Sequence, residues 1–324
     1  FSLSFINSFW SLITIYLTIL ALGSIMMGNL AVAKLISNWF DKNAGRALGI
    51  AAVGISFSGV VLPLIVDPLL DIVGWRNVYV IFASVVLFII LPLIFFVVID
   101  DPYTVNQVKD GMKRDLEEES LPKVMTSKNL LSKKVFWIIS LAFAFQFLSM
   151  MGVIAFLPIH ASKMGLDQTW NLIGFPVKQY VFAYALAAFG GVLGKLIFGY
   201  LIDIMKAAYP SMLAMSLQAT GIFGFTYFSE PSIFLLSALI FGLGYGAATP
   251  LMTACYLRAF GSNNLGKARG ISSPIVAPLQ PIGILITSIF IGFQDTYFVA
   301  FNIMGCFAIV AVFLASQISE PEKI

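Results

Sequence analysis

The sequence predicts an all-α membrane protein whose apolar helices cross a lipid bilayer several times. Of its 324 residues, 59% are hydrophobic and only 11% are charged, whereas a soluble globular protein carries about 25% charged residues. The charges gather in short stretches between apolar runs of about 20 residues or more, which is the length that crosses a ~30 Å hydrocarbon core as a helix. Runs such as NVYVIFASVVLFIILPLIFFVVI (77–99) lack the apolar–polar alternation of barrel strands.

The apolar runs predict nine complete spans. They are Ser11–Trp39, Gly45–Val73, Arg76–Ile99, Val135–His160, Lys178–Met205, Pro210–Phe228, Pro231–Leu257, Arg269–Phe293 and Thr296–Gln317. Residues 1–40 would form one helix of about 60 Å, twice the thickness of the membrane core. We therefore expect a break near Asn7–Ser11, with the tail of an earlier span before it.

The distribution of basic residues predicts the orientation of the chain. With nine spans, fourteen of the 19 lysines and arginines fall in loops on one side of the membrane, and only Arg76, Lys163 and Lys178 fall on the other. Lys34 and Lys195 lie within spans. The positive-inside rule places the side rich in basic residues in the cytoplasm. The net charge of +3 therefore reflects topology, and we expect no nucleic-acid partner.

The chain divides into two halves. Residues 1–99 hold the stub and three spans, residues 100–134 form a polar cytoplasmic linker, and residues 135–324 hold six spans. A mixed-charge segment between apolar blocks is usually a solvated linker.

The two halves repeat each other in sequence. When FDKNAGRALGI (40–50) is placed over FGSNNLGKARGI (260–271), a shift of 221 residues aligns Gly45 with Gly266 and Arg46 with Lys267. Parallel repeats of this kind occur in secondary transporters. By the same shift, about 85 residues would precede Phe1 in an intact repeat, so we expect the sequence to be a fragment that lacks its N-terminal spans.

Three motifs resemble the major facilitator superfamily over essentially the whole chain. GYLID (199–203) resembles the G-x-L-x-D loop motif at the cytoplasmic end of family helix eight. WF (39–40) with GRALG (45–49), followed by GWR (74–76), resembles the entry and exit of family helix five. Within the superfamily, these motifs and the G-K-x-x-x-G pattern at 194–199 look most like the oxalate–formate antiporters and monocarboxylate transporters.

The resemblance implies that Lys195 binds substrate, and the sequence also departs from the family pattern at two places. In that group an arginine that binds a substrate carboxylate usually stands at this position. Monocarboxylate transporters tend to have an acid one turn earlier, where this chain has Gly191. The dicarboxylate antiporters carry a second cation in family helix eleven, where residues 271–293 have no charge. These departures weaken a two-point dicarboxylate clamp and leave proton coupling unsupported.

The position of Lys195 also indicates a binding role without the resemblance. It lies eight residues before Asp203, about 12 Å along a helix, and Asp203 is expected at the cytoplasmic interface. A lysine at the centre of a span costs about 2.5–3.5 kcal/mol, and such residues generally face a bundle interior or mark a substrate path. The alternatives are a lysine that extends to the interface, or one that pairs structurally with another helix.

Uncharged polar residues supply the remaining candidates for substrate binding. They are Tyr184 on the helical stripe of Lys195, Gln146, the pair Thr249 and Thr253 on one helical face, and Gln280. Such residues more often hydrogen-bond neighbouring helices than a ligand.

A second set of residues is expected to act as a conformational latch. The carboxylate of Asp203 can lie against the positive N-terminus of a helix beginning near Arg269, or it can pair with Arg258. By resemblance, Gly199 and Asp203 favour the conformation closed to the cytoplasm.

We therefore expect a secondary transporter that moves a small organic anion, such as a monocarboxylate, by alternating access across the plasma or inner membrane. A coupling proton or a counter-anion and the bilayer are the other partners. We expect no catalysis, cofactor or metal site, because one His and two Cys within or beside spans cannot build one. The alternatives are a drug or cation exporter of the same fold, and a membrane receptor that transports nothing.

Overall fold

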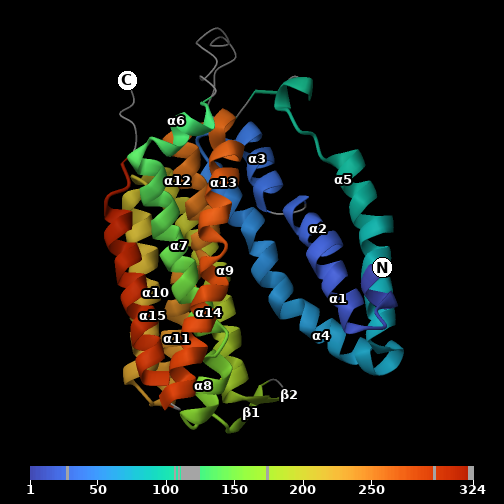
Figure 1. Ribbon diagram of the computed structural model, residues 1–324, viewed down its shortest axis with the longest axis vertical. Coiled ribbons are helices and arrows are strands. Elements are labelled where there is room, and N and C mark those ends of the chain that lie inside the picture. The colour runs from blue at the N-terminus through green and yellow to red at the C-terminus, as the bar shows by residue number, and fades with distance from the viewer. Residues whose placement is uncertain are drawn as a thin grey trace. The chain divides into compact units, whose positions relative to one another are not determined.

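The computed structural model is helical along nearly all of its described length (Figure 1). It describes residues 1–26, 29–105, 107–108, 110, 125–172, 175–294 and 297–319, so 16 of the 35 residues of the predicted linker 100–134 lie outside the described residues. The chain divides into two compact units. Unit one comprises residues 1–41 and 57–114, and unit two comprises residues 42–56 and 115–324.

Unit one contains the predicted stub and most of the first three spans. Its helices are α1 (Phe9–Ile15), α2 (Ala21–Met26), α3 (Asn29–Trp39), the later part of α4 (Ala44–Val85) and α5 (Leu91–Val97). Single π-helical turns at Tyr16–Leu20 and Val86–Ile90 continue α1 into α2 and α4 into α5. Short 3₁₀ turns occur at Ser2–Phe5 and Pro102–Val105. The predicted break near Asn7–Ser11 is present, since α1 begins at Phe9 with Ser8 as its N-cap.

The two predicted spans within α4 meet at a glycine kink. Gly74 has φ 73° and ψ 160°, a left-handed conformation that glycine adopts without a steric penalty. The Gly-Trp-Arg motif is therefore a turn, as its place between Gly45–Val73 and Arg76–Ile99 requires. Arg76 donates a hydrogen bond to the carbonyl of Ile6 (2.9 Å) and its guanidinium lies 4.3 Å from the Trp75 ring centroid.

The other end of unit one is held by the Trp-Phe motif. The indole of Trp39 donates to the carbonyl of Ile99 (2.8 Å), and Asn38 donates to that of Asp100 (3.2 Å). The backbone N–H of Asp110 in turn donates to the carbonyl of Trp39 (2.9 Å). The first two bonds satisfy carbonyls beyond the end of α5 and the third satisfies the last carbonyl of α3, where no donor of the same helix is left.

Unit two contains the beginning of α4 and the whole second half. Its other elements are α6 (Ser127–Leu131), α7 (Lys134–Ile154), α8 (Leu157–Lys163), β1 (Thr169–Leu172), β2 (Phe175–Lys178), α9 (Gln179–Ile204), α10 (Ala208–Tyr227), α11 (Pro231–Gly246), α12 (Ala248–Phe260), α13 (Ser262–Val276), α14 (Leu279–Gln294) and α15 (Tyr297–Ser316). The strands β1 and β2 form an antiparallel hairpin before α9. Three predicted spans of unit two are each broken into a pair of helices, namely α7 with α8, α11 with α12 and α13 with α14.

Six helical segments among the described residues are long and apolar enough to cross a membrane. They are Ile72–Val97, Lys134–Ile154, Gln179–Ile204, Pro231–Phe260, Ser262–Gly292 and Tyr297–Ser316. The remaining predicted spans correspond to α1–α3, the first part of α4, and α10. The all-α, multi-span fold class predicted from hydropathy is therefore confirmed.

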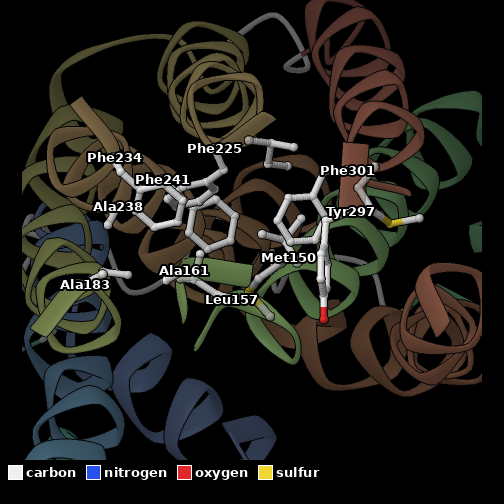
Figure 2. Close-up of a cluster of buried hydrophobic side chains, with 14 of the residues drawn as sticks. Met150, Leu157, Ala161, Ala183, Phe225, Phe234, Ala238, Phe241, Tyr297 and Phe301 are labelled. Carbon is white, nitrogen blue, oxygen red and sulfur yellow. The ribbon is translucent and has the colours of Figure 1, made fainter. Parts of the chain in front are cut away.

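Aromatic side chains form the core of unit two (Figure 2). Phe225 of α10 packs on Phe234 and Phe241 of α11, with ring centroids 4.9 and 5.7 Å apart. Tyr297 and Phe301 of α15 extend this cluster. The cluster joins α10, α11 and α15, and Met150 of α7, Leu157 of α8 and Ala183 of α9 also belong to it.

Glycines let α9 and α11 pack backbone against backbone. A side chain at Gly194 would collide with the carbonyl of Leu243, and one at Gly242 would collide with the carbonyl of Ala187. The glycines of residues 242–246 are therefore packing residues, which is their usual task in membrane helices. This contact fixes the rotation of α9 about its axis, and therefore the direction in which its other side chains point.

We predict that Gly242→Ala lowers the midpoint of thermal unfolding of the detergent-solubilised protein, followed by tryptophan fluorescence. The added methyl has no space beside Ala187 and Gly190, and overpacking of this kind costs about 1–3 kcal/mol. Gly270→Ala is the matched control, because no atom lies within 4 Å of the added methyl. Equal midpoints for the two variants would contradict close packing of α9 on α11.

Candidate functional site

Lys195 is buried in the middle of α9, with 5% of its surface exposed. Its ammonium donates a hydrogen bond to the hydroxyl of Ser56 on α4 (2.5 Å). Among the described residues, none of the carboxylates lies within 4.0 Å of this ammonium. Burying a charge without a counter-charge costs free energy. An anion bound beside Lys195 would reduce this cost.

Small residues surround Lys195 on both sides of α9. A side chain at Gly49 of α4 would collide with the carbonyl of Lys195, so α4 touches the α9 backbone directly. One turn earlier, Gly191 faces the ring of Tyr245 on α11, whose hydroxyl lies 3.1 Å from the position a Cβ would take. Tyr184, Ala188, Gly191, Lys195 and Gly199 follow one another along one stripe of α9. The small residues of this stripe pack against α4 and α11, and Lys195 lies between these two contacts.

The other candidate on α9, Tyr184, is 42% exposed. It interacts electrostatically with Tyr245 of α11. Tyr184 thus lies near the outer part of the stripe, about three turns from Lys195.

Gln146 is held deep inside unit two, with 1% of its surface exposed. Its amide nitrogen donates to the carbonyl of Gly244 on α11 (3.3 Å). Because Tyr245 is the next residue and faces Gly191, α11 connects Gln146 to the α9 stripe that carries Lys195. The structure therefore brings these two candidates to opposite sides of one helix, without direct contact between them.

The threonine pair is engaged within its own helix. Thr253 donates to the carbonyl of Thr249 (3.0 Å), one turn earlier on α12. On the same face, the hydroxyl of Tyr256 lies 2.6 Å from that of Ser140 on α7. This face of α12 is thus directed towards α7. Gln280 is half-buried in the first turn of α14, and no recorded bond joins it to the other candidates.

Two residues of this region were not identified from sequence. Ser56 is a serine in an apolar run, and nothing in the sequence distinguishes it from its neighbour Ser58. Gln218 is the single glutamine of the span Pro210–Phe228, and that isolation could have marked it. Its amide donates to the backbone carbonyl of Gln146 (3.0 Å) and to the hydroxyl of Ser149 (2.8 Å).

Three buried oxygens in unit two have no hydrogen-bond partner among the described residues. They are Oε1 of Gln146, Oε1 of Gln218 and Oγ1 of Thr287. Leaving such a group unsatisfied costs about 1–3 kcal/mol. Thr287 lies against Gly152 of α7, whereas both glutamines contact Gly244 of α11.

Asp203 caps the beginning of α4. Its two carboxylate oxygens accept hydrogen bonds from the backbone N–H groups of Gly45 (2.7 Å) and Arg46 (2.8 Å). The guanidinium of Arg46 lies 3.8 Å from the carboxylate and 4.4 Å from the ring centroid of Tyr200. A carboxylate at a helix N-terminus is favoured both by these donors and by the helix dipole. Gly199 makes room for the contact, since a side chain there would lie 2.7 Å from the carbonyl of Gly45.

This arrangement corrects one expectation about Asp203, since the helix it caps begins at Ala44 and not near Arg269. Arg269 instead interacts electrostatically with Tyr256. Arg258 interacts electrostatically with Asp203, and it donates to the backbone carbonyls of Ile202 and, at 2.7 Å, of Met205 at the C-terminal end of α9. The two repeats offer two similar helix beginnings, and the sequence did not distinguish them.

Comparison with known proteins agrees with this architecture. The crystal structure of the fucose:proton symporter of E. coli is similar, with a TM-score of 0.55 and 12% identity, covering 89% of this chain and 72% of that chain. At this identity the likeness shows the fold alone. No curated protein matches the sequence. Residues 1–279 match the Major Facilitator Superfamily. The chain therefore belongs to the major facilitator superfamily of multi-pass membrane transporters.

Proposed function

We propose that this secondary transporter moves a small organic anion, such as a monocarboxylate, by alternating access, and that Lys195 binds the carboxylate of the cargo. The observation that carries the proposal is a buried ammonium with Ser56 as its hydrogen-bond acceptor and no carboxylate within 4.0 Å among the described residues.

Electrostatics support an anion over other cargoes. An ion pair gains more energy in a low-dielectric interior than in water, and an ammonium is a compact point charge that suits a carboxylate. A cationic drug would be repelled by Lys195. The similar E. coli protein is named for fucose, a neutral sugar, and a neutral cargo would leave the ammonium uncompensated. A proton or a counter-anion moving with or against the anion belongs to the same proposal.

The remaining candidates have weaker support as binding residues. Gln146 is joined to the α9 stripe through α11, and Tyr184 lies on that stripe. The hydroxyl of Thr253 donates to its own helix, which leaves its lone pairs as acceptors. We propose Tyr184, Gln146, Thr249, Thr253 and Gln280 as the polar surroundings of the cargo, with Lys195 as the charged contact.

We further propose that Gly199 and Asp203 form a latch that holds the cytoplasmic ends of α4 and α9 together. Support comes from the two N–H bonds that Asp203 accepts and from the direct backbone contact at Gly199. Arg258 contributes by fixing the end of α9 through two carbonyls. We include Arg269 in the latch by its sequence position alone, and its electrostatic interaction is with Tyr256.

The first prediction concerns uptake of labelled lactate, pyruvate, formate and oxalate into proteoliposomes. We expect saturable uptake of at least one acid, reduced about 10- to 100-fold in Lys195→Ala, because a charge-assisted bond of about 1.5–3 kcal/mol is lost. Lys195→Arg should retain part of the uptake, because the cation remains.

Lys34→Ala is the matched control, since Lys34 is the other lysine within a predicted span and is only half-buried. We expect its uptake to equal that of the unsubstituted protein. If no acid is transported, or if Lys195→Ala transports as well as the unsubstituted protein, the anion proposal is wrong.

The second prediction concerns the latch. Ser56→Cys, in a background with Cys255→Ser and Cys306→Ser, should react faster with a membrane-impermeant thiol reagent from the cytoplasmic side when Asp203→Asn is added. Asparagine offers one acceptor and no charge to the two N–H donors, so the end of α4 separates more often from α9.

Arg46→Ala is the control for this measurement, because it removes the ion pair and keeps both backbone donors. The Arg46 side chain is 43% exposed and its guanidinium lies 3.8 Å from the carboxylate, so solvent screens the pair and labelling should change less than in Asp203→Asn. Equal acceleration by Arg46→Ala and Asp203→Asn would show that the ion pair, and not the helix cap, closes this end.

A further inference from the structure

Three helices of unit two meet at a group of polar residues of which the proposed anion site uses Gln146 alone. We call Gln146 and Ser149 of α7, Gln218 of α10 and Gly244 of α11 the amide cluster. Gly244 packs on the backbone of Gln218, where a side chain would have no space. Both glutamine side chains are at least 99% buried.

The hydrogen bonds of the cluster fix the direction of both amides. Gln218 donates through its nitrogen to the Gln146 carbonyl (3.0 Å) and to the Ser149 hydroxyl (2.8 Å), and Ser149 donates to the Gln146 carbonyl (3.0 Å). Turning the Gln218 amide over would place its oxygen against the Gln146 carbonyl, which cannot donate. Gln146 donates in turn to Gly244 (3.3 Å).

Both N–H groups of the Gln218 amide, one N–H group of the Gln146 amide and the Ser149 hydroxyl donate in these bonds, and the two side-chain amide oxygens are left as acceptors. Oε1 of Gln146 and Oε1 of Gln218 are buried and have no partner among the described residues. A partner for these two oxygens must be a cation or a hydrogen-bond donor that the described residues do not supply.

The helix beside the cluster is interrupted, and the interruption frees a further acceptor. Helix α11 ends at Gly246, and α12 begins at Ala248. Pro250 has no N–H, so the carbonyl of Gly246 loses the donor that a continuous helix would give it. Interrupted helices whose carbonyls coordinate ions near the membrane midplane are a recurrent feature of secondary transporters.

We propose that the amide cluster binds a sodium ion through the side-chain oxygens of Gln146 and Gln218, with carbonyls at the α11–α12 interruption completing the shell. Amide and carbonyl oxygens are hard ligands that suit a hard cation. Mg²⁺ and Ca²⁺ usually take carboxylates as well, and no group of three or more His, Cys, Asp or Glu that could hold a metal occurs among the described residues. Neutral oxygens alone therefore favour a monovalent ion. This adds a site that the scarcity of His, Cys and carboxylates did not lead us to expect.

Sodium would also change the charge that crosses the membrane. One Na⁺ moving with one monoanion is electroneutral, so a sodium gradient could drive uptake without opposition from the membrane potential. This coupling rests on the proposed anion transport, whereas sodium binding itself does not.

The test measures binding of ²²Na⁺ to the purified protein, with NaCl, KCl and choline chloride as competitors at equal ionic strength. We expect saturable binding that NaCl displaces and choline does not. Gln146→Leu and Gln218→Leu should weaken it at least tenfold. Thr287→Val, which removes the third unpartnered oxygen away from the cluster, should bind as the unsubstituted protein does. Lys195→Ala should also retain sodium binding, so failure of the anion proposal is distinguished from failure of this one.

A second measurement covers variants that fold poorly. The midpoint of thermal unfolding of the unsubstituted protein should rise saturably with NaCl and not with choline chloride, because a ligand that binds only the folded state stabilises it. Absence of saturable ²²Na⁺ binding to the unsubstituted protein would overturn the proposal and leave a buried water as the partner of the two oxygens. Equal displacement by KCl would overturn the assignment to sodium, and loss of binding in Thr287→Val would move the site to α14.

Discussion

The contact of the α9 backbone with two neighbouring helices is the constraint on which the rest of unit two depends. Gly190 and Gly194 admit α11 on one side, and Gly199 admits α4 on the other. In a bilayer the hydrophobic effect gives helices little reason to associate, so close van der Waals packing between small residues must do so. Because α9 also carries Lys195 and Asp203, the same packing fixes the buried ammonium and the carboxylate that caps α4. The binding candidate and the latch are thus two turns apart on one rigid element.

Satisfaction of polar groups explains why so few residues stand out as functional. Within hydrocarbon, an unpaired polar group has no water to bind. Most hydroxyls of unit two solve this locally, as when Ser140 donates to Phe136 (2.7 Å) and Thr226 to Ile222 (2.9 Å), one turn earlier on the same helix. The polar groups of glutamine and lysine lie at the ends of long side chains, so they do not easily bond to a carbonyl one turn earlier on their own helix. The exceptions are therefore informative. The anion proposal depends on Lys195, and the sodium proposal depends on Gln146 and Gln218.

Sequence patterns predicted the elements better than their partners. Hydropathy located the spans. The motif at Gly74 predicted a turn, and the motif at Trp39 lies where side-chain hydrogen bonds join α3 to the end of α5, because both features depend on local chemistry. The partner of Asp203 could not be predicted, since the repeat offers two similar helix beginnings, at Gly45 and at Gly266. Only packing distinguishes them: a side chain at Gly45 would collide with α9, whereas nothing lies within 4 Å of one at Gly266. Ser56 escaped notice because one serine in an apolar run gives no indication of which helix it faces.

The anion proposal and the sodium proposal share one mechanical link, which is α11. Its Gly244 accepts a bond from Gln146, and the adjacent Tyr245 faces Gly191, one turn before Lys195. An ion that draws the two glutamine oxygens together also fixes α11, and α11 cannot shift along α9 without breaking the contact at Gly194. Coupling between two sites requires that each ligand favour the same arrangement of a shared element. A sodium ion at the amide cluster and an anion at Lys195 would both favour the arrangement in which α11 lies tightly on α9, so each would strengthen binding of the other.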